Sequence, residues 1–183
     1  MHTVSFTFII SVAAKRRRGG LTMFKINNTP VVIERYPDET LRLNIEVATG
    51  EAAATEAGGG EGEITIEWLF EKDEEMVLFF IVKHLRENYK PKRLFLKMPY
   101  IPHARMDRVK GVQEVFTLKY FCEFINSLEF DKVIVRDAHS NVSLALLNNV
   151  VQESVAENIT KLASSLLNKE RDIVFYPDRK SVV

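Results

Sequence analysis

Charged side chains that can hold phosphate follow an apolar stretch near the middle of the chain. Residues 94–98 read Leu-Phe-Leu-Lys-Met, and Arg105, Asp107 and Arg108 come shortly after them. Two guanidinium groups on one loop can bind a polyphosphate through paired, charge-assisted hydrogen bonds. Two prolines at the start of the loop restrict it, which lowers the entropy cost of ordering it around a ligand. The loop is therefore a candidate polyphosphate site, with a solvated charged loop as the alternative.

A carboxylate and an imidazole follow a second apolar stretch. Asp137 and His139 come directly after Val-Ile-Val-Arg at residues 133–136. Ligands of open parallel α/β sheets bind just beyond the carboxyl ends of the strands, so we expect both segments at one edge of a sheet. An Asp-x-His at a strand end can serve one magnesium–phosphate site, although Mg²⁺ prefers oxygen and the imidazole contact is expected to be weak or indirect. A structural histidine is the alternative.

In this order, the two segments resemble the ATP-side motifs of the ribose-phosphate diphosphokinase family, the phosphoribosyl pyrophosphate synthetases. Residues 99–108 read Pro-Tyr-Ile-Pro-His-Ala-Arg-Met-Asp-Arg, where the family carries Pro-Tyr-x-Pro-Tyr-Ala-Arg-Gln-Asp-Arg. Residues 137–141 read Asp-Ala-His-Ser-Asn, which is close to the Asp-Pro-His-Ser-Asp of divergent and phage-type members. Met106 replaces the family's Gln beside the nucleotide, so adenine contacts are expected to differ. His103 takes an aromatic position and is expected to pack with an exposed tip.

A third segment, Arg-Tyr-Pro-Asp-Glu-Thr at residues 35–40, is similar to the family's flag segment. In the family this turn reaches a neighbouring subunit, where its aromatic ring stacks on adenine and its polar groups hydrogen-bond the base. Tyr36, Asp38 and Glu39 would take these roles. Here the turn is one residue shorter and lacks the family's Gly. Without the resemblance it is an ordinary Pro-Asp turn.

The resemblance implies diphosphoryl transfer from Mg-ATP to the C1 hydroxyl of ribose 5-phosphate, giving phosphoribosyl pyrophosphate and AMP. It implies Mg²⁺ as cofactor, ATP and ribose 5-phosphate as partners, a homo-oligomer (dimer or hexamer) at full length, and a cytoplasmic location. The implied roles are catalytic for Arg105 and His139, nucleotide-binding for Arg105, Asp107, Arg108, Tyr36, Asp38 and Glu39, and metal-binding for His139 and Asp178.

The chain resembles only the N-terminal half of such a synthetase, as a C-terminally truncated member. The family's Lys-x-Arg loop and its Thr-Gly-Gly-Thr ribose-phosphate loop belong to the second half. We therefore expect this polypeptide to be inactive by itself. Two alternatives stay open: a non-catalytic regulatory homologue, which Met106 and the short flag turn favour, and a phosphoribosyltransferase of the same fold.

The elements that would position these residues follow from hydrophobic spacing. Alternating strands and helices predict a parallel α/β sheet, and by resemblance the three-layer sandwich of the type I phosphoribosyltransferase-like fold. The expected strands are 24–33 (a strand or hairpin), 41–47, 64–70, 93–98, 132–136 and 173–176. The expected helices are 71–89, 112–128 and 154–168, and 48–63 is expected to be a flexible loop.

Helical spacing also predicts which side chains face the core. For the first helix these are Val77, Phe80, Ile81, His84 and Leu85. For the second they are Leu118, Phe121, Cys122, Ile125 and Leu128.

Composition narrows the function classes. The chain has 25 basic and 25 acidic residues and no net charge, which argues against nucleic acid as a partner. Its one cysteine excludes an internal disulfide framework and fits a reducing compartment. The apolar stretch at residues 4–14 precedes its basic cluster, unlike a secretory signal, and is too short to span a bilayer, so no membrane partner is expected.

These features give four expected regions. Residues 1–22 are expected to be a non-native or disordered extension, with Met23 as the true start. Residues 23–150 are expected to form the ATP-side domain, and 151–177 to begin a truncated second domain. Residues 178–183 can be encoded by the start of a common sequencing adapter and are expected to be an artefact of it.

Overall fold

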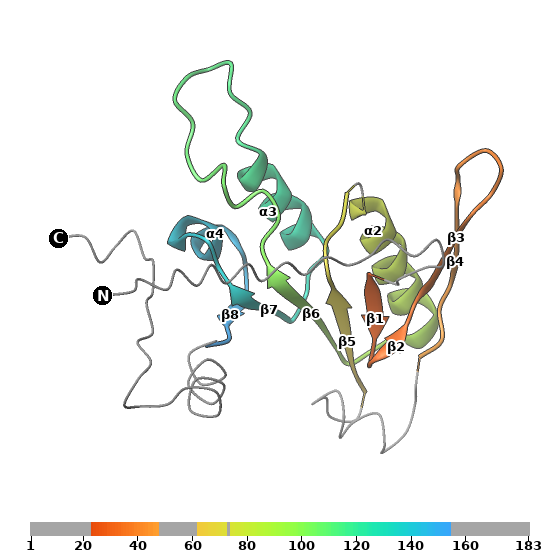
Figure 1. Ribbon diagram of the computed structural model, residues 1–183. Coiled ribbons are helices and arrows are strands. Elements are labelled where there is room, and N and C mark those ends of the chain that lie inside the picture. The colour runs from red at the N-terminus through yellow and green to blue at the C-terminus, as the bar shows by residue number, and fades with distance from the viewer. Residues whose placement is uncertain (1–22, 48–61, 73, 155–183) are drawn as a thin grey trace, which may run out of the picture.

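A computed structural model describes residues 23–47, 62–72 and 74–154. They form a mixed α/β structure with a central six-stranded sheet in the order β2-β1-β5-β6-β7-β8 (Figure 1). The strands are β1 (Phe24–Ile26), β2 (Thr29–Pro30), β3 (Val32–Arg35), β4 (Leu41–Asn44), β5 (Glu63–Trp68), β6 (Arg93–Tyr100), β7 (Lys132–Asp137) and β8 (Val150–Gln152). The helical segments are α2 (Glu75–His84), the π-helical turn η1 (Leu85–Tyr89), α3 (Thr117–Ser127) and α4 (Asn141–Leu146).

The sheet is mostly parallel, as predicted. Strands β5, β6, β7 and β8 pair in parallel, with α2 and η1, then α3, then α4 as the connections. Only β1 is antiparallel, pairing with β2 and with β5. The expected hairpin at 24–33 is confirmed in β1 and β2, which are joined by Asn27 and Asn28 at positive φ, a backbone that asparagine tolerates better than most residues.

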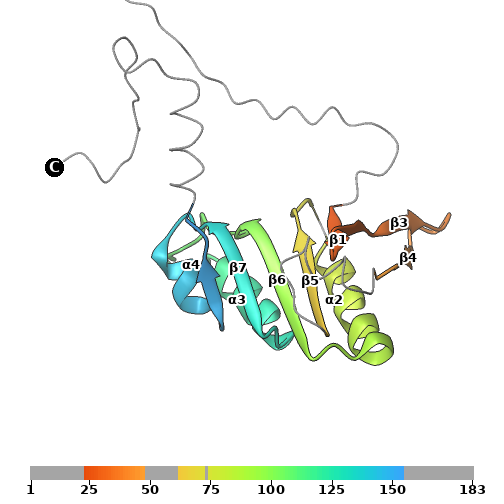
Figure 2. The ribbon, with the colours of Figure 1, turned by 90° about the horizontal axis from the view of Figure 1, so that it is seen from below.

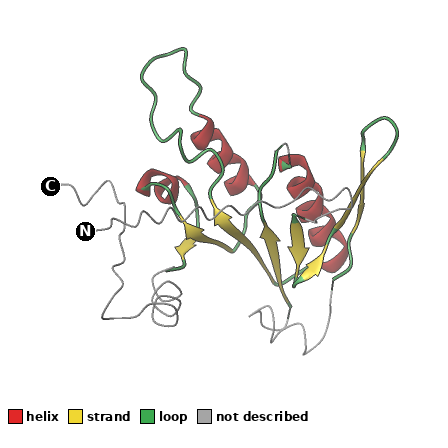
Figure 3. Ribbon diagram, in the orientation of Figure 1, coloured by secondary structure: helices red, strands yellow, loops and turns green. Residues whose placement is uncertain are grey.

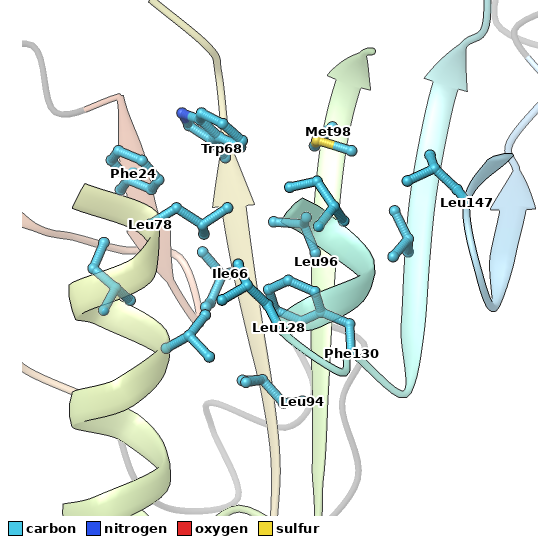
Figure 4. Close-up of a cluster of buried hydrophobic side chains, with 14 of the residues drawn as sticks. Phe24, Ile66, Trp68, Leu78, Leu94, Leu96, Met98, Leu128, Phe130 and Leu147 are labelled. Carbon is cyan, nitrogen blue, oxygen red and sulfur yellow. The ribbon is translucent and has the colours of Figure 1, made fainter. Parts of the chain in front are cut away.

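The main core lies between the sheet and its helices. Helices α2 and α3 lie on the same side of the strands (Figure 2) and contribute to one cluster of buried apolar side chains with β1, β5, β6 and β7. Figure 4 shows part of this cluster, with Ile66 and Trp68 on β5 and Leu96 and Met98 on β6. In the described residues, α2, α3 and α4 form one helical layer. The helix predicted at 154–168 and the strand predicted at 173–176 lie outside these residues.

The predicted core face of α3 is confirmed, but that of α2 is partly wrong. All five predicted residues of α3 and its C-cap are buried. On α2, Val77, Ile81 and Leu85 are buried, whereas Phe80 is 42% exposed and His84 is exposed. Leu78 and Val82 are buried instead. The helix is apolar on more than one face, so spacing alone left its rotation open, and contact with β1 and β5 decides it.

Several predicted boundaries shift. Helix α2 begins at Glu75 and not at 71, and α3 begins at Thr117 and not at 112. Strand β6 continues past Pro99, because the ladder pairs Met98 with Val135 and Tyr100 with Asp137 and needs no N–H from the proline. The short α4 and β8 had no clear periodic signal and were not predicted.

The segment predicted as a strand at 41–47 lies outside the central sheet. Its ordered part, β4, pairs only with β3 in a separate two-stranded hairpin (Figure 1). Strand β8 crosses the expected domain boundary after residue 150 and pairs with β7. The division into domains otherwise stays a prediction, since 1–22, 155–177 and 178–183 lie outside the described residues. None of the described helices has the length and hydrophobicity needed to cross a bilayer.

Candidate functional site

The two segments singled out in the sequence leave the sheet side by side. Parallel pairing of β6 with β7 places Tyr100 opposite Asp137 at the carboxyl ends of the two strands. The chain after Tyr100 becomes a long projecting loop, residues 101–116, that leads into α3 (Figure 3). His139 follows β7 by two residues, in the short connection to α4. The predicted common edge is therefore present, although the described contacts do not join the loop to His139.

The base of the 101–116 loop is anchored while its middle is open. Ile101 and Ala104 are buried. The Tyr100 hydroxyl donates a hydrogen bond of 2.9 Å to the Phe70 carbonyl. The His103 ring lies 6.1 Å from the ring of Phe70 and 5.4 Å from that of Phe121 (centroid distances). As expected, His103 packs with a partly exposed tip.

A carboxylate adds to this anchor. Nε2 of His103 lies 3.7 Å from Oε1 of Glu75, the first residue of α2, and His103 has a positive φ of 60°. No sequence pattern indicated that Phe70 and Glu75 would contact this loop, because a helix and a strand separate them from it along the chain. These contacts fix where the chain turns towards the two arginines.

Arg105 and Arg108 are exposed beyond this anchor. The Arg108 Nε–H donates to Oδ1 of Asp107 at 3.1 Å, and the arginine side chain is 80% exposed while the aspartate is 19% exposed. Asp107 therefore holds Arg108 without covering its terminal guanidinium nitrogens. Two accessible guanidinium groups on one anchored loop can accept a polyphosphate. The individual roles of Arg105, Asp107 and Arg108 stay predictions.

His139 is exposed at the carboxyl end of β7. Next to it, Ser140 caps α4 with an extended backbone, and its carbonyl accepts a hydrogen bond of 2.6 Å from the Ser143 hydroxyl. The Ser140 hydroxyl oxygen is buried and has no hydrogen-bond partner in the described part of the molecule. The predicted metal contact of His139 stays a prediction, and Asp178 lies outside the described residues.

The predicted flag residues lie at the tip of the β3–β4 hairpin. Tyr36 is 50% exposed. Asp38 accepts hydrogen bonds from the hydroxyl of Thr40 at 2.6 Å and from its backbone N–H at 3.1 Å, and these bonds lower the pKa of the Asp38 carboxyl. Glu39 has a positive φ of 67°, and its carbonyl accepts a 2.8 Å bond from Nη1 of Arg35. The turn lacks the family's glycine, and Glu39 adopts a strained backbone there. The hydrogen bonds made by Asp38 and by the Glu39 carbonyl stabilise it.

In Figure 1 the 101–116 loop extends above α3, left of centre, and the β3–β4 hairpin extends at the right edge, so the two stand apart. No hydrogen bond or ion pair between them is found in the described residues. Within one chain, Tyr36, Asp38 and Glu39 are therefore not brought to Arg105 and Arg108.

The described residues do not form a magnesium site of their own. Residues 23–47, 62–72 and 74–154 contain no group of three His, Cys, Asp or Glu side chains placed to hold a metal ion. A single imidazole is a poor match for Mg²⁺, which prefers oxygen ligands and keeps several waters. These residues would suit a magnesium ion that arrives on the phosphates of a nucleotide better than one held by the protein alone.

Trp68 and Glu74 form a partly buried polar contact near this edge that the sequence did not reveal. Oε2 of Glu74 accepts hydrogen bonds from Nε1 of Trp68 at 3.1 Å and from the backbone N–H of Glu71 at 2.8 Å. Burial raises the pKa of the Glu74 carboxyl above its ordinary 4.5, against the opposing effect of these bonds. Through these bonds Glu74 joins the end of β5 to the start of α2.

Glu74 gives a pH-dependent prediction. A carboxyl group whose pKa is raised in the folded state stabilises the fold less as pH rises from 4.5 through the raised value. Glu74→Gln keeps an acceptor for Trp68 and loses this titration, so its unfolding free energy should improve relative to the parent chain as pH rises. Solvent screening should keep the change below about 1 kcal/mol. Urea denaturation of both chains at pH 4, 5.5 and 7 measures it, and a pH-independent difference would contradict it.

No protein-family model matches the chain, and no curated protein matches it. Among solved structures, it is similar to the crystal structure of phosphoribosylpyrophosphate synthetase from Mycobacterium smegmatis, with a TM-score of 0.56 and 12% sequence identity. The match covers 74% of this chain and 43% of the synthetase chain, so this chain spans less than half of that protein's length. At this identity the likeness shows the fold, a mostly parallel α/β sheet of the phosphoribosyltransferase-like kind.

Proposed function

We propose that this chain is the ATP-side part of a ribose-phosphate diphosphokinase, whose complete form transfers the diphosphoryl group of Mg-ATP to the C1 hydroxyl of ribose 5-phosphate. One observation carries the proposal: two segments that resemble the family's ATP motifs leave adjacent strand ends, Tyr100 and Asp137, of a sheet whose fold is similar to that of a synthetase. Either motif alone, or the fold alone, would be weaker support.

In this proposal the chain's own residues bind and orient the triphosphate. Arg105 and Arg108 hold phosphate oxygens through charge-assisted hydrogen bonds, and Asp107 keeps Arg108 in place. His139 would lie beside the magnesium-bound phosphates. Asp178 is given no role in this proposal, because residues 178–183 are expected to be an adapter artefact. Phosphoryl transfer depends on such positioning and on neutralisation of the developing charge. The ribose 5-phosphate contacts belong to the second half of the family's enzymes.

The proposal is tested by isothermal titration of the chain with ATP, with and without Mg²⁺. We expect saturable binding that strengthens when Mg²⁺ is present, because the loop and His139 would act on the magnesium complex of the nucleotide. Ribose 5-phosphate alone should bind weakly or not at all. Absence of ATP binding by a folded chain would reject the proposal. If that chain still associated with itself, the regulatory homologue, which Met106 and the short flag turn favour, would become the better explanation.

We further propose that a second copy of the chain supplies the adenine contacts, because the hairpin that carries Tyr36 and the loop that carries Arg105 stand apart in one molecule. In a two-fold dimer, each hairpin would reach the partner's loop. Tyr36 would stack on the base, and Asp38 and Glu39 would hydrogen-bond its edge.

Mixing two damaged chains tests this arrangement. Tyr36→Ala and Arg105→Ala chains should each bind Mg-ATP weakly. After equilibration in equal amounts, roughly a quarter of the wild-type binding capacity should return, because each mixed dimer contains one intact site. ATP titration of the mixture measures it. If no capacity returns although mixed dimers are detected by mass spectrometry, the two residues act within one chain or on different sites.

A further inference from the structure

The sheet face opposite the helices carries a groove that the proposed nucleotide site does not use. Lys25, Glu67 and Lys97 alternate along their strands with buried core residues, so their side chains point to this opposite face. Strand register places them in a row, since Glu67 pairs with Lys25 on β1 and with Lys97 on β6. Together with their neighbours they line a cavity of about 360 Å³.

An apolar row lies next to this charged row, one step closer to the carboxyl ends of the strands. It consists of Met23, Leu69 and Pro99, which line the same cavity. The Leu69 N–H donates a 2.9 Å hydrogen bond to the Met23 carbonyl, which extends the β1–β5 ladder to this level. Leu69 is 49% exposed. One side of the groove is therefore apolar, and the other side is charged.

The charges of the groove do not cancel. Nζ of Lys97 lies 3.7 Å from Oε1 of Glu67, and Nη2 of Arg136 lies 3.4 Å from Oε2 of Glu153 at the other end of the cavity. Lys25 adds a third cation on the far side of Glu67. Among the described residues that line the groove, three cations thus face two carboxylates, which leaves an excess of one positive charge.

We propose that this groove binds a small organic anion, a carboxylate or a phosphate ester with an apolar body. Its volume lies within the usual range for small-molecule pockets, roughly 300–1,000 Å³, and a largely apolar wall with a few convergent charges is typical of such sites. The anionic group would lie beside Lys25, the cation that adds the excess positive charge, and the body would rest on Met23, Leu69 and Pro99. This site is separate from the loop that carries Arg105 and goes beyond the proposed function.

Methionine methyl groups provide the test, because they report on the two sites separately. The full chain is labelled at its methionine methyls and titrated with phenyl phosphate or with benzoate, while Met23, Met76 and Met106 are followed by NMR. We expect saturable shifts at Met23 and none at Met76 or at Met106 on the 101–116 loop. Inorganic phosphate and phenol, which each lack half of the proposed ligand chemistry, should bind at least fivefold more weakly. Stronger binding of phenyl phosphate than of benzoate would indicate a phosphate ester, and the reverse a carboxylate.

Charge variants complete the test. Lys25→Ala should weaken binding at least fivefold, whereas Lys119→Ala, which removes an exposed cation on α3, should leave it unchanged. Both substitutions are on the surface and should preserve the fold, which the remaining methyl signals would report. The proposal is overturned if the shifts occur at Met106, if inorganic phosphate binds as well as phenyl phosphate, or if Met23 is unaffected because the chain beyond Ser154 already fills the groove.

Discussion

Replacing Arg105 and Arg108 together with alanine should weaken Mg-ATP binding by at least about 10- to 100-fold, because losing even one hydrogen bond to a charged partner costs about 1.5–3 kcal/mol. The physical reason is local. Both guanidinium groups are exposed on a loop whose base is fixed by buried Ile101 and Ala104. Ordering them around a ligand therefore costs little entropy. The loss should be largest for ATP and smaller for AMP, which lacks the phosphates that the arginines would hold. Isothermal titration measures both.

Lys110→Ala is the matched control for this prediction. Lys110 is an exposed cation on the same loop, and its contact with Glu114 is made through its backbone N–H, which alanine keeps. Its effect should stay within about twofold, the size of a screened surface charge. Equal losses in the control and the double variant would mean that the loop attracts ATP only through its net charge. In that outcome the phosphate-binding role of Arg105 and Arg108 would be abandoned.

Trp68→Ala should destabilise the fold by about 3–5 kcal/mol, the usual cost of removing a buried aromatic side chain. Trp68 is fully buried at the carboxyl end of β5. Its ring stacks on Phe24 at 5.5 Å and meets Phe70 edge-on at 5.4 Å (centroid distances). Trp68 therefore links β1 and β5 to Phe70, which contacts the base of the 101–116 loop. Losing it would also leave the Glu74 carboxylate without its indole donor. Urea denaturation measures the change.

Trp68→Phe separates packing from hydrogen bonding. It keeps most of the aromatic contact and removes only the donor to Glu74, so it should cost about 1–2 kcal/mol.

Cys122 offers an independent measurement, because burial raises the pKa of its thiol to about 11 and the folded chain should react slowly with thiol reagents. Labelling of Cys122 should be fastest in Trp68→Ala. If the Trp68→Ala chain were as stable as the parent, the aromatic cluster of Phe24, Trp68 and Phe70 would not stabilise this part of the sheet.

The sequence by itself determined the parts of this protein that depend on neighbouring residues. Hydrophobic spacing predicted a strand or hairpin at residues 24–33, the strands β5, β6 and β7, and the buried face of α3. These predictions succeeded because a residue's burial in an amphipathic helix or strand repeats with the period of the backbone. The order of apolar stretch and polar loop also predicted that Arg105 and His139 would follow strand ends.

The tertiary structure alone decided what depends on residues far apart in the chain. It rotated α2 so that Leu78, and not Phe80, is buried, and it placed the hairpin with Tyr36 away from the loop with Arg105. It also brought Lys25, Glu67 and Lys97 into one row from three strands. Periodicity predicts which face of each helix or strand is apolar. Strand order and register determine which of these faces meet, because those contacts are selected by packing of the whole sheet.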